Sequence, residues 1–295
     1  MQIYRLLDER KMPNNFAPIM FDTSLFLKRR KTALARAHKE GKNPWFLHEF
    51  ACEGTIEILQ TIKQDFECGA ELFAGNGQFQ QIANQAGVLG ASRKLAKLEE
   101  IEPSLSENKN PNCLSELLLP EIGQDKYDLI IANSGLNWVN DLPGLLLQIR
   151  KSLRPEGNFI ATFLGGSTLK ELRQCFLDVE AEYYGGASPR ISPMINCETG
   201  VRLLVRAGFH SPVSSSEILK VRYGNVFELF RDIKAMGEAA AFANKNIKPL
   251  SRHLIAKVAD YYQARYCDGD NRVYASFELI TISGWASKSG VVFES

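Results

Sequence analysis

The sequence has little of what a metal site or a disulfide framework needs. Its 295 residues include six cysteines and four histidines, and no pair of cysteines has the CxxC spacing. The scattered cysteines argue against a structural zinc site and against a secreted disulfide scaffold. They fit a reducing compartment, and we expect no metal site.

Long apolar runs and an excess of one charge are also missing. No apolar run is long enough to cross a bilayer. The first twenty residues carry Asp8 and Glu9 and have no apolar signal core, so we expect no secretory peptide. The net charge of +1 gives no overall attraction to nucleic acid, and none is expected as a partner.

A basic run stands out locally, at Lys28-Arg29-Arg30-Lys31. We interpret it as one face of a solvated helix that begins at the helix cap Asp22. The alternative is an anionic partner, such as peripheral contact with a membrane surface. Residues 1–43 then form an N-terminal arm and a basic helix.

The strongest local pattern is a glycine-rich turn in residues 71–79, Glu-Leu-Phe-Ala-Gly-Asn-Gly-Gln-Phe. An acid closes an apolar run, the turn follows, and a helical pattern begins at once. This is how an α/β sheet opens a nucleotide-type crevice at the carboxyl end of its first strand. An ordinary strand-to-helix turn is the simpler alternative.

Apolar runs and helical patterns alternate over residues 45–165, which predicts a parallel, doubly wound sheet. The expected strands are 68–73, 87–90, 113–114, 127–133 and 158–164. Asp141 and Pro143 are expected to start the helix between the last two. Strands at 217–223 and 274–285, separated by helices, are expected to form an antiparallel pair at the sheet edge. We expect a core domain at 44–165 and a C-terminal part at 166–295 that completes the sheet and caps the site.

Several longer motifs resemble one protein family. They are Leu-Asn-Trp-Val-Asn-Asp-Leu-Pro at 136–143, Leu-Arg-Pro-Glu-Gly at 153–157, Gly-Gly with Thr-Leu at 165–169, and Ser-Pro-Arg-Ile-Ser-Pro at 188–193. The chain resembles the class I S-adenosylmethionine-dependent methyltransferases. More narrowly, it resembles the methyltransferase-fold family that includes the mitochondrial arginine hydroxylase acting in complex I assembly, and its alphaproteobacterial relatives. The implied fold is α/β: a Rossmann-like seven-stranded sheet with an antiparallel last strand, N-terminal helices and C-terminal helical insertions.

The resemblance implies S-adenosylmethionine as cofactor and a set of positions that would hold it. The sequence departs from the family pattern at three places. Phe73 replaces the first glycine of the turn and is expected to crowd the amino acid end of the cofactor, and Gly90 falls where an acid should hold the ribose. Ser115 or Glu116 stands where an acid normally approaches the adenine amino group. These departures predict weakened or lost binding. The cofactor positions are Glu71, Gly75, Asn76, Gly77, Gly90, Ser115 and Asn133.

Asn137 and Trp138 occupy the position that faces the reacting group in this family, and we assign them as the catalytic pair. A core role for the tryptophan is the alternative. Substrate contacts are assigned beyond the fifth strand. Thr168 with Glu171 also reads as a capping box, and Arg173 as an ion-pair partner of Glu171. The substrate positions are Gly166, Thr168, Arg173 and Arg190.

The resemblance implies an enzyme that modifies a protein side chain, an arginine hydroxylase or assembly factor for respiratory complex I whose partner is a complex I subunit. A second interpretation is an acyl-carrier or small-molecule O-methyltransferase. A third is a non-catalytic scaffold that kept the fold and lost the cofactor. The expected location is the cytoplasm of a bacterium, or the mitochondrial matrix if the source is eukaryotic.

Overall fold

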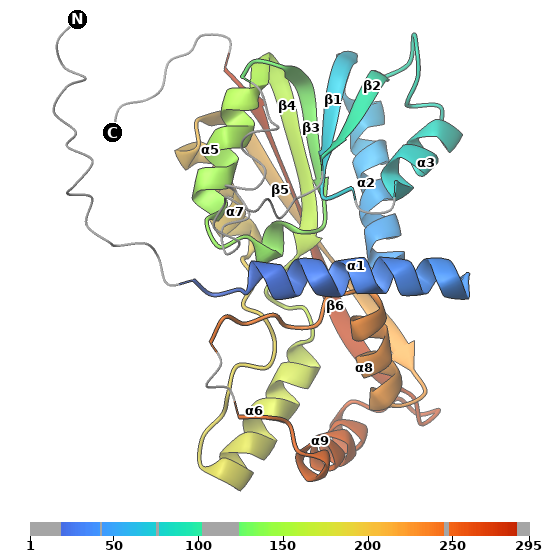
Figure 1. The fold of residues 1–295 in the computed structure, drawn as a ribbon, viewed down its shortest axis with the longest axis vertical. Coiled ribbons are helices and arrows are strands. Elements are labelled where there is room, and N and C mark those ends of the chain that lie inside the picture. Colours follow the sequence, from blue (N-terminus) through green and yellow to red (C-terminus); the bar gives the residue numbers. More distant parts are fainter. Residues whose placement is uncertain (1–18, 42, 75–76, 102–123, 245–247, 288–295) are drawn as a thin grey trace, which may run out of the picture.

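The structure is a computed structural model, and it describes residues 19–41, 43–74, 77–101, 124–244 and 248–287 (Figure 1). The helices are α1 (Thr23–Glu40), α2 (Phe46–Thr61), α3 (Gln78–Gln85), η1 (Leu136–Trp138), α5 (Leu142–Ser152), α6 (Lys170–Tyr184), α7 (Cys197–Arg206), α8 (Val226–Ala235) and α9 (Arg252–Arg265). The strands are β1 (Phe66–Leu72), β2 (Leu95–Ile101), β3 (Tyr127–Asn133), β4 (Leu153–Leu164), β5 (Phe209–Tyr223) and β6 (Val273–Ala286).

The strands form one sheet in the order β2-β1-β3-β4-β6-β5. The first four are parallel, whereas β6 runs antiparallel to both β4 and β5. The predicted Rossmann-like α/β class and the antiparallel pair at the edge are confirmed. The described residues form six strands, whereas seven were expected, and the predicted strand at 113–114 lies outside them.

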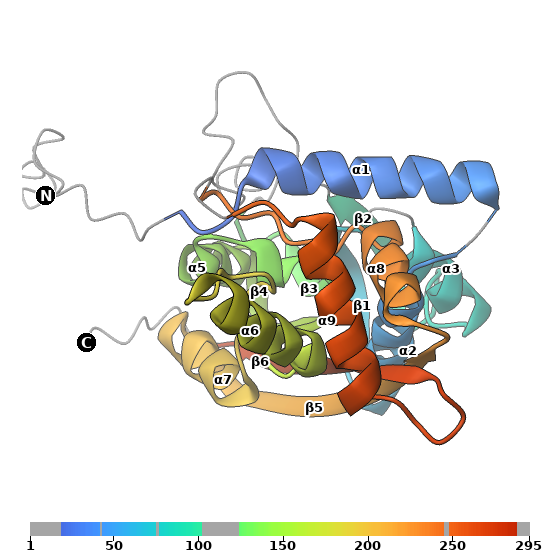
Figure 2. The same cartoon turned by 90° about the horizontal axis from the view of Figure 1, so that it is seen from below.

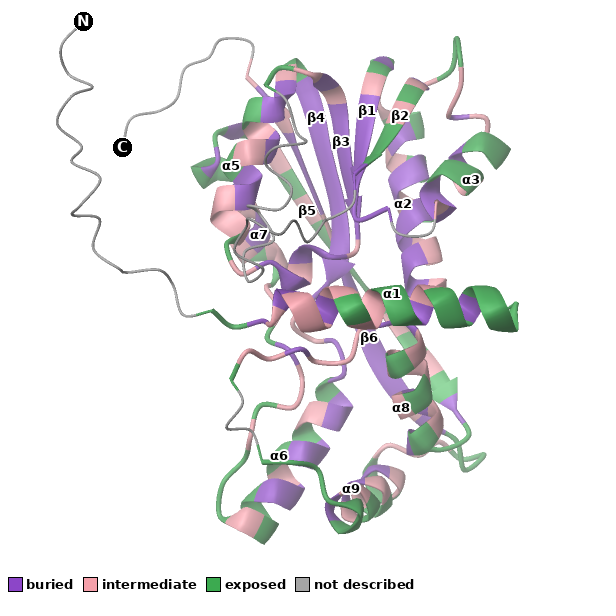
Figure 3. Cartoon of the chain, in the orientation of Figure 1, coloured by how far each residue is buried: buried purple, intermediate pink, exposed green. Residues whose placement is uncertain are grey.

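Helices cover both faces of the parallel strands, and β3 shows why its sequence is continuously apolar. Leu129 and Ile131 pack with α2 and α3, while Ile130 and Ala132 pack with α5 and α7. Successive side chains of a strand point to opposite faces, so a strand covered on both sides needs apolar residues throughout. Figure 3 shows β3 as almost uniformly buried, whereas β2 at the sheet edge is largely exposed.

Two predicted helix starts are confirmed by their caps. The Asp22 carboxylate accepts a hydrogen bond from the backbone N–H of Leu25, and Asp141 accepts one from that of Gly144. Each cap satisfies an N–H group that the first helical turn leaves without a partner. A third predicted start is wrong, because α6 begins at Lys170 and Thr168 does not cap it.

The predicted second strand is also wrong. Residues 87–90 contribute only an isolated bridge between Leu89 and Leu95, and the strand itself is β2, Leu95–Ile101. The error arose because β2 lies at the sheet edge, where only Leu95 and Ile101 are buried and the apolar signal is weak. The shift of about eight residues changes which acid lies at the carboxyl end of this strand.

The β5–β6 pair extends past the carboxyl edge of the parallel strands. Below that edge in Figure 1, α6, α8 and α9 pack around the extension, and α6 and α9 lie side by side in Figure 2. Helix α1 crosses the molecule between this lower part and the parallel strands. No helix among the described residues is both long and apolar enough to cross a membrane. The domain boundaries at 43/44 and 165/166 stay predictions.

Candidate functional site

The carboxyl edge of the parallel strands is the candidate site, and α1 lies across it (Figure 1). Glu71 is fully buried one residue before the end of β1. In register it stands between Glu100 of β2 and Ile131 of β3. The structure therefore places Glu71 at the edge where the sequence assigned it.

An acid lies beside the glycine turn, at a position that the sequence interpretation missed. Gly77 has a left-handed φ of 63° and precedes α3. A Cβ added to it would stand 3.4 Å from the Glu100 carboxylate oxygen Oε1. Gly90, the position that the sequence pattern gave to this acid, is bonded to Leu95 at the amino end of β2, the opposite end of the strand. Gly90 and Gly77 therefore do not meet.

The side chain of Phe73 lies between the end of β1 and the end of β3. Its backbone is left-handed, with φ 62°, and its side chain is fully buried. A Cβ added to Gly135, just after β3, would stand 2.5 Å from the ring carbon Cγ, so the ring lies directly on the Gly135 backbone. The benzyl group thus packs into the main core cluster at the edge where crowding was expected.

Asn133, the last residue of β3, is held by α2. The Thr55 hydroxyl donates a hydrogen bond of 2.8 Å to its Oδ1, and both side chains are fully buried. Its Nδ2 has no oxygen or nitrogen partner among the described residues and faces the thiol of Cys52, which is a weak acceptor. A buried amide with one bonded atom and one donor that lacks a strong acceptor is better suited to meet a polar ligand than to cap a loop.

His48 of α2 lies next to Asn133 and is 6% exposed. Its ring hydrogen-bonds the Asn133 backbone, and Nδ1 also stands 3.3 Å from the Ser134 hydroxyl. Nε2 has no partner among the described residues, whereas Nδ1 faces the Ser134 hydroxyl, so we assign the proton to Nδ1 and the lone pair to Nε2. Burial first, and the positive charge of Arg30 second, lower the pKa of His48 to about 3, so the ring is neutral at neutral pH.

A small polar cavity of about 30 Å³ adjoins this histidine. Arg30, His48, Ser134, Met236 and Glu238 are among the side chains that line it. The volume is that of about one water molecule. The candidate site therefore includes a small space whose wall carries the Arg30 guanidinium, the Glu238 carboxyl group, the His48 ring and the Ser134 hydroxyl.

Asn137 and Trp138 converge on Glu238, which follows α8. The indole N–H of Trp138 donates to the Glu238 carboxylate at 2.7 Å, and the Asn137 amide does so at 3.5 Å. Burial raises the pKa of Glu238, while these two bonds and Arg30 oppose the rise. Trp138 is 1% exposed and stacks on Phe26 with ring centroids 5.2 Å apart. Its surroundings are those of a core aromatic that also positions an acid.

The basic run of α1 is only partly a solvated face. Lys28 and Lys31 are exposed, as predicted. Arg29 instead donates to the backbone carbonyls of Ala239 and Ala240, and Arg30 donates to that of Phe73. These two arginines therefore fasten α1 to the loop after α8 and to the glycine turn. The sequence interpretation was wrong for both, because charge alone does not show which carbonyls a side chain can reach.

Three of the assigned substrate positions are tied to one another. Arg173 donates to the backbone carbonyls of Gly166, at 2.9 Å, and Thr168, at 3.3 Å. The Thr168 hydroxyl bonds the backbone of Glu278 in β6. Glu171, predicted to pair with Arg173 or to close a capping box, instead binds Ser276. These bonds hold the start of α6 against β6.

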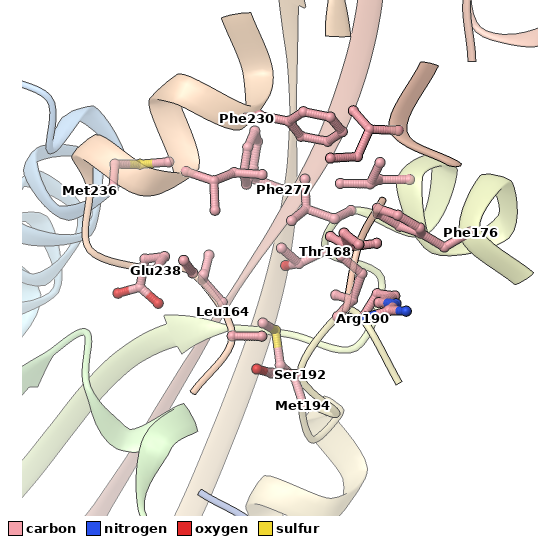
Figure 4. A pocket seen from close by; sticks show the side chains of 18 residues that line it. Leu164, Thr168, Phe176, Arg190, Ser192, Met194, Phe230, Met236, Glu238 and Phe277 are labelled. Carbon is pink, nitrogen blue, oxygen red and sulfur yellow. The ribbon is translucent and has the colours of Figure 1, made fainter. Parts of the chain in front are cut away.

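Arg190 lines a second, larger cavity of about 230 Å³, together with Thr168 (Figure 4). Its Nε donates to a Glu180 carboxylate oxygen at 2.8 Å, and the two side chains are 8% and 0% exposed. The arginine is therefore neutralised inside the protein. The cavity wall is mostly apolar, and Met236 and Glu238 line both cavities.

Three assigned cofactor residues, Gly75, Asn76 and Ser115, lie outside the described residues. Among the residues that are described, no three His, Cys, Asp or Glu side chains are grouped so that they could hold a metal ion. The missed residue Glu100 had one signal in the sequence: it closes the weak apolar alternation that starts at Leu95.

No family model matches the chain, but comparison with known proteins gives relatives that are similar over most of it. The chain is 35% identical to the zebrafish arginine-hydroxylase NDUFAF5, mitochondrial, over 90% of this chain and 82% of that protein. It is 31% identical to the human arginine-hydroxylase NDUFAF5 over 88% and 75%. It is also 29% identical to a malonyl-[acyl-carrier protein] O-methyltransferase of Halorhodospira halophila, over 64% and 63%. Among solved structures, a Haemonchus contortus phosphoethanolamine N-methyltransferase 2 with S-adenosyl-L-methionine matches with a TM-score of 0.40 and 12% identity, over 79% of this chain and 52% of that one.

Proposed function

Because this chain belongs to the family of the arginine-hydroxylase NDUFAF5, we propose that it binds S-adenosylmethionine and modifies an arginine of a respiratory complex I subunit. The similarity extends over most of the chain and most of those relatives, so it includes the glycine turn, the carboxyl edge and the C-terminal helices. The proposal therefore concerns one site that the whole chain builds.

The observation that carries the cofactor part of the proposal is the Glu100 carboxylate beside Gly77. A carboxylate at the end of the second strand is the group that accepts hydrogen bonds from ribose hydroxyls in such sheets. The residues present at this end fit an adenosyl ligand. Glu100 would hold the sugar, and the glycine turn with Glu71 and Asn133 would hold the amino acid end. When bound, the cofactor supplies a reactive sulfonium centre.

The remaining polar groups at the edge would prepare the site for a polar substrate group. The open Nε2 of His48 accepts a hydrogen bond, and Glu238, positioned by Asn137 and Trp138, supplies a carboxylate. Trp138 and Phe26 exclude water from that side of α1, which strengthens each polar contact. In this proposal Asn137 and Trp138 act through Glu238.

Calorimetric titration with S-adenosylmethionine tests cofactor binding. We expect a Kd in the micromolar range for the full chain. Glu100→Gln should weaken binding by roughly 10- to 100-fold, since a hydrogen bond to a charged group contributes about 1.5–3 kcal/mol. Glu99→Gln is the matched control, because this neighbouring acid bonds Lys126 and Tyr127 instead. Absence of heat at millimolar cofactor contradicts the proposal.

Mass spectrometry tests the substrate part. The candidate complex I subunit is isolated from cells with and without the protein, and its arginines are searched for an added oxygen or methyl group. A mass increase of one oxygen that disappears without this protein supports arginine hydroxylation. An unmodified subunit in both samples contradicts the substrate assignment and leaves cofactor binding to be judged by the titration.

Two other functions have their own supporting observations. The malonyl-[acyl-carrier protein] O-methyltransferase relative and the large apolar cavity favour acyl-carrier or small-molecule O-methylation. The ring of Phe73 on Gly135 favours a non-catalytic scaffold, because it occupies space at the methionine end. The variant Phe73→Gly distinguishes the non-catalytic scaffold from the enzyme functions. If the ring is the obstacle, the variant binds S-adenosylmethionine at least tenfold more tightly than the parent.

Location and membrane contact also remain proposals. The relatives are mitochondrial by name, which supports the matrix for a eukaryotic source. For a bacterial source we propose the cytoplasm. Lys28 and Lys31 on the exposed side of α1 would supply peripheral contact with an anionic membrane. Sedimentation with anionic vesicles, compared between the parent and Lys28→Glu/Lys31→Glu, measures that contact.

A further inference from the structure

The large cavity lies below the carboxyl edge. It is lined by α6, α8, β6 and the loop after α8 and opens partly to solvent (Figure 4). Leu172, Phe176, Phe230 and Phe277 contribute carbon atoms to its wall, and its volume is about 230 Å³. Apolar side chains that face such a space lack packing contacts on that side. A ligand with an apolar surface would supply those contacts.

The charged side chains on the cavity wall are already neutralised or bonded within the protein. Arg190 is paired with Glu180, and Glu238 accepts hydrogen bonds from Trp138 and Asn137. In Figure 4 Arg190 and Glu238 lie at opposite edges of the ring of side chains. A charged group that left water for this cavity would have to displace one of these pairs, so desolvation disfavours ionic ligands.

Of the polar groups on the wall, Ser192 alone has an open buried atom among the described residues. Its side chain is 3% exposed and its hydroxyl oxygen has no hydrogen-bond partner, whereas the Thr168 hydroxyl both donates to and accepts from the Glu278 backbone. A buried hydroxyl without a partner is costly. A ligand with a single uncharged oxygen would satisfy it.

The volume sets the length of the ligand. An apolar cavity of about 150 Å³ holds benzene, with six carbons. By the same ratio, 230 Å³ holds about nine carbons. We propose that this cavity binds an uncharged aliphatic chain of about nine carbons, an acyl or alkyl group whose one oxygen bonds Ser192. An arginine side chain does not fit this description, because it has three methylenes and ends in a cation.

This inference requires neither the cofactor nor arginine modification, so its failure and theirs are distinguishable. The test titrates the full chain, without cofactor, with 1-alkanols of four to twelve carbons. Each methylene should tighten binding about fourfold up to about nine carbons, after which the affinity levels off. Nonanoate and nonylguanidinium should bind at least tenfold more weakly than 1-nonanol. A flat chain-length series, or tighter binding of either ion, overturns the proposal.

Variants locate the ligand. Ala240→Phe fills the cavity and should abolish binding, whereas the same change at exposed Ala181 of α6 should leave it unchanged. Leu172→Ala enlarges the cavity, so the levelling-off should move to about twelve carbons even if the filled variant fails to fold. Ser192→Ala should weaken 1-nonanol about fivefold. An unchanged optimum in Leu172→Ala contradicts binding here.

A final comparison shows whether the bound aliphatic group is free or attached to a carrier. Nonanoyl pantetheine, a thioester, is titrated beside 1-nonanol. Tighter binding of the thioester assigns the cavity to a carrier-bound acyl chain, and equal binding assigns it to a free one. If the thioester does not bind, and the alcohols bind weakly with no dependence on their length, the cavity takes no aliphatic ligand.

Discussion

The two cavities that share Met236 and Glu238 differ in how their polar groups are satisfied. At the carboxyl edge, His48 Nε2 and Asn133 Nδ2 are buried with no oxygen or nitrogen partner among the described residues. In the lower cavity, Arg190 and Thr168 are bonded to other parts of the protein, and the Ser192 hydroxyl is the one open polar atom of the wall among the described residues. Several open polar atoms indicate a polar ligand, whereas an apolar wall with a single open hydroxyl indicates an apolar ligand with one oxygen.

The difference follows from the elements that supply the walls. The edge is where the parallel strands end, and α1 lies across it (Figure 1). Short polar side chains, such as Asn133 and Ser134 after β3, meet α2 there. The lower cavity lies between helices and the extended β5–β6 pair, which bury continuous apolar faces. One chain therefore offers two kinds of binding chemistry, separated by the loop that carries Glu238.

The largest expected effect tests whether Arg190 is held by Glu180 inside the protein or is available to bind a substrate. Glu180→Gln should lower the free energy of unfolding by about 3–5 kcal/mol, because it leaves the buried guanidinium without its counter-ion. Denaturant unfolding measures it. Glu182→Gln, on an exposed acid of the same helix, should change it by less than about 0.5 kcal/mol.

The double variant Glu180→Met/Arg190→Met completes that test. It should recover most of the lost stability, since it removes both charges together. A loss below about 1 kcal/mol in Glu180→Gln would show that Arg190 does not depend on Glu180 and is available to a ligand.

The second effect concerns the neutral state of His48. Its pKa is about 3 in the folded protein, whereas a histidine in an unfolded chain has its ordinary pKa of 6.5. Between these values the unfolded chain binds a proton that the folded one does not, so stability falls as pH falls, by roughly 1.4 kcal/mol per pH unit. The variant His48→Asn should remove the contribution of His48 to this change of stability with pH. His253→Asn, at an exposed position, should keep it.

Unfolding measured from pH 7 to pH 4 gives the slope difference between parent and variant. If both fall equally with pH, His48 is protonated in the folded state. The polar edge would then present a cation where we infer a lone pair.

The smallest effect tests the contact between Phe73 and Gly135. Gly135→Ala should cost about 1–3 kcal/mol, because the new methyl meets the ring and the residue has φ 94°. Phe73→Ala should relieve the clash, so the double variant should lose less than the sum of the two single variants. Gly186→Ala, where nothing lies within 4 Å, is the control.

If the stability losses of the two single variants add up in the double variant, the Phe73 ring does not contact the Gly135 backbone. The ring would then not mark the boundary between the core and the polar edge. Thermal unfolding of the four proteins is sufficient for this comparison.

The sequence predicted the fold where strands are buried on both faces and helices are capped, as at β3 and Asp141. It failed at β2, because an edge strand with one weakly apolar face resembles a loop. The same failure moved the proposed ribose position to Gly90 and away from Glu100. Motif residues such as Thr168 and Arg173 were found, but their bonds lie within the protein and were not predictable from spacing.

By itself the sequence determined the α/β class, most of the strands and helices, the position of the glycine turn and the family, because apolar periodicity and local turn chemistry are properties of neighbouring residues. Tertiary structure alone decided that Glu100 reaches Gly77, that Phe73 lies on Gly135, and that Arg29 and Arg30 fasten α1. Each of these contacts joins segments far apart along the chain. Their existence depends on how layers pack, which no local pattern encodes.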